Sequence, residues 1–335
     1  MFSYIIKRML LMIPTLLGII VITFAVVHLA PGDPAALRAQ SAGEMLSSDM
    51  MTRQIVDQTR AIYGLDKPLH VQFGRWLKQV ATLDFGTSYR DHRKVRSKIA
   101  DALPITLTLN VLTILIIYIV SIPLGTITAL KPRGLADRAS AFVLFVLYSL
   151  PSFWVAMMLI VIFGGGDHLN WFPISGFVSD NASRLPWYGW MSNVAWHLVL
   201  PVACLTYGGF AFLSRFARAA LLEVIRQDYI RTARAKGLSE WRVVVAHGLR
   251  NAMIPLLTLM GTLLPALLGG SVIIEQIFSI PGMGRLGFES VLARDYPVIM
   301  AIATISAFLT LASILITDIL YVIVDPRISF EKRSA

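Results

Sequence analysis

The chain has 335 residues, of which 56% are hydrophobic and 15% are charged, and its formal net charge is +10. A soluble domain of ordinary composition carries roughly 25% charged residues, so this deficit excludes an ordinary water-soluble enzyme and a disordered protein. The single cysteine, Cys204, excludes a disulfide framework and cannot form a thiolate metal cluster alone.

Six stretches free of Asp, Glu, Lys and Arg are long enough to cross a bilayer, which takes about 20 apolar residues in a helix. Because unpaired backbone groups are costly in lipid and these runs do not alternate, we expect helices. The sequence therefore predicts an all-α membrane protein with six transmembrane helices. The stretches are Met9–Gly32, Ile105–Leu130, Ala139–Gly166, Leu185–Ser214, Asn251–Ile274 and Tyr296–Thr317, the last continuing to about Val324.

The basic residues predict the orientation of these spans. Sixteen lie at the two termini and in the loops after the second and fourth spans, whereas three lie in the short loops on the opposite side. The positive-inside rule then places both termini in the cytoplasm. The positive charge is thus a signal of topology, and we expect no nucleic-acid partner.

A long segment follows the first span on the outer side. Leu29–Pro34 ends the span, because prolines disfavour helix upstream and glycine permits a tight turn. Arg53–Tyr63 has weak helical spacing, Tyr63–Pro68 predicts a turn, and Val71–Leu83 places apolar residues at helical intervals. We expect a small helical cap on the outer membrane face, with a plain spacer as the alternative.

Four tryptophans cluster in and beside the outer loop between the third and fourth spans. An aromatic belt at the membrane interface is the simpler interpretation, and a docking surface for an extracellular partner is the alternative. They are Trp171, Trp187, Trp190 and Trp196.

The loop after the fourth span is rich in arginine and predicts two short helices. Good helix formers lie on both sides of Gly237, which would end the first helix in a left-handed conformation, and Ser239 would begin the second. Such an elbow could serve only to anchor the chain to lipid headgroups. Ala233 and Ala235, however, predict a smooth surface against which another protein could pack.

Prolines and glycines interrupt the fourth and fifth spans. They are common in membrane helices for packing alone. Alternatively the fifth span bends to form a gate, for which the candidate residues are Pro255, Gly261 and Pro265.

Few residues in or near the spans can carry charge or bind a metal. Asp318, His28 and His197 lie close to span ends, where capping or interfacial hydrogen bonding is the simpler role. Six histidines scattered singly predict no metal site. A phosphate-binding Gly-x-x-x-x-Gly-Lys loop is also excluded, since the chain contains no Gly-Lys pair.

Tyr229–Gly237, which reads YIRTARAKG, resembles the EAA loop of ABC-importer permeases. Ala233 and Gly237 match that pattern, Arg231 and Thr232 replace its Glu and first Ala, and only Leu249 fits the motif that follows. These departures are similar to those of the dipeptide, oligopeptide and nickel branch, and the resemblance covers essentially the whole chain. Further matching stretches are Ile6–Arg8, Ala30–Pro34, Tyr63–Pro68, Phe85–Gly86, Ile277–Arg285, Arg294–Pro297 and Asp325–Arg327.

Within that branch, four stretches are most similar to permeases for longer peptides and the peptide antibiotic microcin C. They are Phe163–Gly166, Trp171–Pro173, Leu185–Tyr188 and Asp325–Glu331.

The resemblance implies the type I permease fold with a periplasmic helical insertion, in the cytoplasmic (inner) membrane of a bacterium. The implied parts are 1–32 with the first span, the insertion 33–103, the permease core 104–324 with a coupling loop at 218–252, and a cytoplasmic tail 325–335.

The resemblance also implies that the chain forms half of a peptide pathway. Its partners would be a second homologous permease subunit, two ABC ATPase subunits that carry ATP and Mg, a periplasmic peptide-binding protein and the lipid bilayer. The chain itself would have no catalytic residue, no metal and no cofactor. Its ATPase-coupling residues would be Arg231, Thr232, Ala233, Arg234, Ala235, Lys236, Gly237, Leu249 and Arg250.

Other functions stay open at this point. Nickel or glutathione are alternative substrates within the same class. A secondary transporter would need more spans or intramembrane carboxylates. A channel or receptor would not explain the arginine-rich elbow, and no nucleophile–base pair supports a membrane-embedded enzyme.

Overall fold

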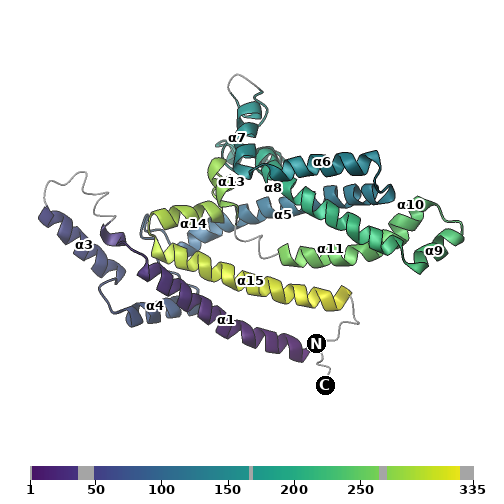
Figure 1. The fold of residues 1–335 in the computed structure, drawn as a ribbon. Coiled ribbons are helices and arrows are strands. Elements are labelled where there is room, and N and C mark those ends of the chain that lie inside the picture. Colours follow the sequence, from purple (N-terminus) through teal and green to yellow (C-terminus); the bar gives the residue numbers. More distant parts are fainter. Residues whose placement is uncertain (1, 37–48, 166–168, 264–269, 325–335) are drawn as a thin grey trace. The chain divides into compact units, whose positions relative to one another are not determined.

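A computed structural model describes residues 2–36, 49–165, 169–263 and 270–324 (Figure 1). This part of the chain is helical, and its only bridges are two isolated pairs, Thr87 with Lys94 and Gly164 with Asn170. The helices are α1 (Phe2–Leu29), α3 (Asp49–Tyr63), α4 (Leu69–Thr82), α5 (Val95–Leu130), α6 (Leu135–Ser149), α7 (Ser152–Phe163), η1 (Ala182–Arg184), α8 (Trp187–Ile225), α9 (Asp228–Ala235), α10 (Glu240–Arg242), η2 (Val243–Leu249), α11 (Arg250–Leu263), α13 (Val272–Ile277), α14 (Met283–Leu292) and α15 (Tyr296–Val324).

Four of the described helices, α1, α5, α8 and α15, are each long and apolar enough to cross a membrane. The third predicted span is different, because α6 and α7 meet at an angle of 96°. The stretch predicted as the third span, Ala139–Gly166, is therefore not one continuous helix. Pro151 explains the break, since Leu150 before it is extended at φ −86° and ψ 129°, away from the helical region.

The fifth predicted span is described at its two ends. It begins with α11, which ends at Leu263, and α13 starts at Val272. Pro265, one of the three candidate gate residues, lies between them and outside the described residues.

The chain divides into two compact units. The first combines the N-terminal region up to Pro104 with Gly282–Ala312, and the second takes Ile105–Pro281 and the region from Ser313. The long helices α5 and α15 each contribute to both units.

In the first unit, the helices expected after the first span are present as α3 and α4. The expected turn between them contains Gly64 at φ +68°. Trp76 of α4 and Phe24 of α1 belong to one buried apolar cluster, and His28 of α1 lies 3.1 Å from the side chain of Gln72 on α4. Because α4 packs on α1, the segment is a folded element and not a plain spacer.

A buried carboxylate links three segments of this unit. Asp295, 1% exposed, precedes α15 and accepts hydrogen bonds from the Ser88 hydroxyl and from the backbone N–H of Tyr89, the latter at 2.9 Å. The ammonium of Lys98 on α5 lies 3.9 Å from the same carboxylate. Asp295 therefore ties the loop before α5 to the start of α15.

In the second unit, α5 and α8 pack closely through glycine. A Cβ atom at Gly125 would lie 2.7 Å from the carbonyl oxygen of Ser214 and 2.8 Å from the Cβ of Ala217. Small residues allow membrane helices to approach in this way. The same helix α8 also contacts α6, α7 and α11, so it is the central element of this unit.

Candidate functional site

The arginine-rich loop forms a compact elbow, which we define as residues 228–249. Figure 1 shows α9 and α10 beyond the adjoining ends of α8 and α11, at one end of the second unit. In α9, Asp228 occupies the first turn and Arg234 the last, the arrangement that complements the helix dipole.

The bend of the elbow depends on Gly237. Its φ is +77°, and its N–H donates to the Arg234 carbonyl at 2.9 Å. No heavy atom lies within 4 Å of the position that a Cβ would take. Glycine is therefore required by the left-handed backbone and not by crowding. This confirms the predicted helix end. Ser239 occupies the predicted N-cap position before α10, although its side chain makes no capping hydrogen bond.

A small apolar core stabilises the elbow from within. Ile230 and Ala233 share one face of α9, because they are three residues apart, and both are buried with Val243 while Leu238 packs against them. The prediction that Ala233 belongs to a smooth outer surface is therefore wrong. Val243 covers this face of α9, and Ala235 is exposed as predicted.

An ion pair joins the two sides of the bend. The Arg234 guanidinium donates to both carboxylate oxygens of Glu240, with Nε–Oε2 at 3.0 Å and Nη2–Oε1 at 2.6 Å. The hydrogen bond from Arg234 lowers the pKa of the Glu240 carboxyl. Because the side chains are 39% and 54% exposed, the pair contributes about 0.2–1 kcal/mol. The pair holds the two sides of the bend together but adds little to the stability of the elbow.

The last part of the elbow is a π-helix that leads into α11. η2 runs from Val243 to Leu249, where we expected an ordinary helix. Val244 of η2 is fully buried in a cluster with Leu221 of α8 and Ala129 of α5, and a Cβ at Gly248 would lie 3.2 Å from Leu221 Cδ1. π-Helical turns are rare and frequent at functional sites. This packing fixes the elbow against the C-terminal end of α8.

The outer surface of the elbow is basic and partly aromatic. Trp241 is 62% exposed and Tyr229 is 41% exposed, and the Tyr229 hydroxyl accepts a hydrogen bond from the Asn251 amide at 2.6 Å. Sequence reasoning missed both aromatic side chains, although two large rings in a short charged loop are a signal. Of the predicted coupling residues, Leu249 is half-buried and the exposed ones are Arg231, Thr232, Arg234, Ala235, Lys236, Gly237 and Arg250.

The candidate gate residues are only partly described. Pro255 is exposed and lies inside α11, which continues through it to Leu263, and Gly261 lies in the same helix. The proline thus does not end the helix, and the gate stays a prediction.

A fully buried carboxylate on α13 was missed. Glu275 is 0% exposed and accepts a hydrogen bond from the Thr106 hydroxyl of α5 at 3.0 Å. The charge-free stretch was taken to end at Ile274, so its next residue was not considered. An ionisable residue buried among membrane helices is a functional candidate by default.

The elbow offers a basic and aromatic contact surface. Within residues 2–36, 49–165, 169–263 and 270–324, no three His, Cys, Asp or Glu side chains are grouped to hold a metal ion. The basic and aromatic groups of the elbow suit packing against an acidic or apolar groove of another protein.

Comparisons with known proteins all match membrane components of transport systems. Residues 121–330 match the family model described as binding-protein-dependent transport system inner membrane component, and residues 1–110 match the N-terminal model of the same kind of component. The oligopeptide transport system permease protein AppB of Bacillus subtilis is 40% identical over 98% of this chain and 100% of its own length.

Two further relatives match over almost the full length. The inner membrane ABC transporter permease protein YejB of Escherichia coli O157:H7 is 37% identical over 99% of this chain and 100% of its own. The glutathione transport system permease protein GsiC of Salmonella paratyphi A is 38% identical over the same two shares.

Proposed function

Because the chain belongs to the family of inner membrane components of binding-protein-dependent transport systems, we propose that it is the permease subunit of an ATP-driven peptide importer. It is a multi-pass inner membrane protein. Peptide is the proposed cargo because AppB is named for oligopeptides and GsiC for glutathione, itself a small peptide. Glutathione is accordingly the second candidate substrate.

The elbow carries the proposal for coupling. It is a short rigid unit with its own apolar core, rooted in α8 through Val244 and Leu221. A displacement of its outer surface would therefore move α8, because packed elements shift between discrete arrangements and do not deform smoothly. The exposed ones among its predicted coupling residues would bind a groove of a cytoplasmic ATPase subunit, while a second homologous permease would complete the pathway.

In this proposal, ATP binding and cargo delivery belong to partner subunits. This chain has no Gly-Lys pair and hence no phosphate-binding loop of that kind, so ATP and Mg would bind to two partner ATPase subunits. A periplasmic peptide-binding protein would deliver the cargo. Both termini and the coupling loop, 218–252, would lie in the cytoplasm and the insertion, 33–103, in the periplasm. The proposed core is 104–324, between the first span in 1–32 and the tail 325–335.

Uptake by the reconstituted complete importer tests this function. Labelled oligopeptide should enter proteoliposomes only with ATP and the binding protein, and unlabelled glutathione should compete weakly. Inactivating the phosphate-binding lysine of the ATPase subunits should abolish entry. Uptake by the purified chain alone would contradict the proposal, and stronger competition by glutathione than by oligopeptide would favour the second substrate.

A further inference from the structure

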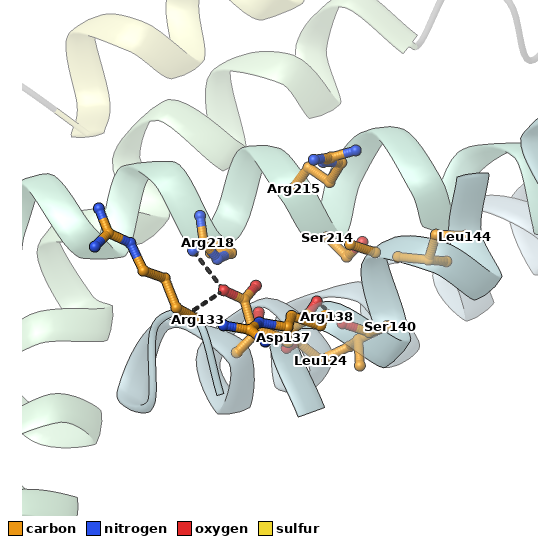
Figure 2. A pocket seen from close by; sticks show the side chains of 11 residues that line it. Leu124, Arg133, Asp137, Arg138, Ser140, Leu144, Ser214, Arg215 and Arg218 are labelled. Atoms are coloured by element: carbon orange, nitrogen blue, oxygen red, sulfur yellow. Dashed lines mark hydrogen bonds and ion pairs between the residues drawn. The ribbon is translucent and has the colours of Figure 1, made fainter. Parts of the chain in front are cut away.

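A second basic cluster lies in a cavity of about 240 Å³ formed by α5, α6, α8 and the turn between α5 and α6. Figure 2 shows Arg218 reaching from α8 toward Asp137 on α6. We call this cavity the arginine pocket. Its lining residues are Leu124, Thr128, Arg133, Asp137, Arg138, Ser140, Ala141, Leu144, Ser214, Arg215 and Arg218.

The arginine pocket has an excess of positive charge. Four arginines are among its lining residues, against the single carboxylate residue Asp137. That carboxylate accepts from Arg218 Nη2 at 2.7 Å and from the backbone N–H of Arg133 at 2.8 Å. Among the residues that the structure describes, no carboxylate pairs with the side chains of Arg133, Arg138 or Arg215. The four arginines and one aspartate give the lining an excess of three positive charges.

Arg218, the fourth arginine of the lining, has a buried donor atom without a hydrogen-bond acceptor. The Arg218 side chain is 30% exposed and pairs with Asp137, which is 14% exposed. Its Nε atom is shielded from solvent and has no hydrogen-bond partner. A buried donor that stays unsatisfied is costly, and a guanidinium is suited to bidentate binding of a phosphate. Asp137 therefore uses only part of the hydrogen-bonding capacity of the Arg218 guanidinium.

The apolar surroundings indicate how that anion is presented. Leu124 and Leu144 line the pocket, and Phe142 and Phe145 of α6 are 69% and 65% exposed. A soluble anion makes no favourable contact with such an apolar surface, whereas the acyl chain of a lipid packs against it. Basic pockets between membrane helices on the cytoplasmic side bind anionic headgroups.

We propose that the arginine pocket binds the phosphate of an anionic phospholipid from the cytoplasmic leaflet. Arg138, Arg215 and Arg218 would donate to the phosphate oxygens, and the acyl chains would lie against α6. The inference rests on the proposed function for its orientation, because that orientation places the turn between α5 and α6 at the cytoplasmic surface.

Lipid retention by the complete purified importer tests the inference. The importer is exchanged into detergent with phosphatidylglycerol or with phosphatidylcholine of the same acyl chains, and bound lipid is counted by native mass spectrometry. Changing Arg138→Gln and Arg215→Gln together should weaken phosphatidylglycerol retention about thirty-fold, because each substitution removes a charge-assisted hydrogen bond to the phosphate. Phosphatidylcholine retention should not change.

A charge-matched control removes two basic residues outside the pocket. Lys131 lies in the turn beside the pocket and Arg226 follows α8, and both are exposed and absent from the lining. Lys131→Gln with Arg226→Gln should keep phosphatidylglycerol at the unmodified level. If the glutamine variant of the pocket fails to assemble, Arg138→Lys with Arg215→Lys should assemble and retain less phosphatidylglycerol than the unmodified importer, because lysine lacks the bidentate geometry of arginine. Unchanged retention in this lysine variant would overturn the inference.

The outcomes separate the sources of the phosphate. Equal loss of phosphatidylglycerol in the pocket variant and the control would overturn the inference. Loss of inorganic phosphate binding with unchanged phosphatidylglycerol would assign the pocket to a soluble anion and also overturn it. Lipid retention is measured without peptide or ATP, so a failure of ATP-driven peptide uptake would refute the proposed function and leave this result intact.

Discussion

Replacing Gly237 should impair coupling in proportion to the strain that each side chain adds to a left-handed residue. Gly237 has φ +77° and open space where a Cβ would be, so Gly237→Ala introduces backbone strain without a clash. Gly237→Val adds a β-branched side chain that tolerates this conformation least, whereas Gly237→Asn is tolerated there.

The backbone strain from Gly237→Ala is comparable to the stabilisation that the Arg234–Glu240 ion pair gives the bend. An alanine in the left-handed conformation destabilises the bend by about 1–2 kcal/mol. Alanine also lowers the conformational entropy of the unfolded chain, which stabilises the folded state by about 0.4–1 kcal/mol. The net cost is about 1 kcal/mol, which is roughly fivefold in the population of the bent state. The exposed pair between Arg234 and Glu240 supplies about 0.2–1 kcal/mol. That pair cannot absorb the strain.

The assay is ATP-dependent peptide uptake, divided by the abundance of the chain in the membrane. Uptake per chain should fall in the order Asn, Ala, Val at position 237, with abundance nearly unchanged. Gly208→Ala is the matched control, because Gly208 has equal open space but no positive φ. Parallel loss of uptake and abundance would mean that Gly237 has only a structural role and would refute the reasoning.

Three further changes test the packing and the charges. Gly125→Ala should lower the stability of the purified chain by about 1–3 kcal/mol in thermal unfolding, because its Cβ would lie 2.7 Å from a backbone oxygen; Gly208→Ala should not. Asp295→Ala should cost about 1–3 kcal/mol for each of the two donors that it leaves unpaired; unchanged proteolysis of the loop before α5 would argue against this. Glu240 has a lowered pKa when folded, so its stabilisation is complete at neutral pH and is lost as acidification passes that pKa. The protection of α9 amides against hydrogen exchange, corrected for the intrinsic rate at each pH, should therefore fall in acid, and Glu240→Gln should remove this dependence.

The features that the sequence predicted correctly depend on local signals. The end of α9 at Gly237 needs only a glycine after helix-forming residues, and α4 needs only apolar residues at helical intervals. Each signal lies within one turn or one helix face. Such features do not depend on what packs against them.

The features that were missed depend on contacts between distant residues. Ala233 is buried because Val243 covers it, which the spacing of alanines alone does not reveal. The arginine pocket joins Asp137 to Arg218 across 81 positions. The right-angled break at Pro151 was missed for another reason, because hydropathy alone defined the span.

Cysteine labelling of the elbow tests the central claim most directly. Ala235 is exposed and Cys204, the one natural cysteine, is buried, so Ala235→Cys places one accessible thiol on the elbow. In membranes that contain the complete importer, an impermeant maleimide should react with this thiol only from the cytoplasmic side, and a short bifunctional reagent should join it to an ATPase subunit. Reaction from the periplasmic side, or the absence of any link to an ATPase subunit, would contradict the role of the elbow as the contact through which ATP hydrolysis moves this chain.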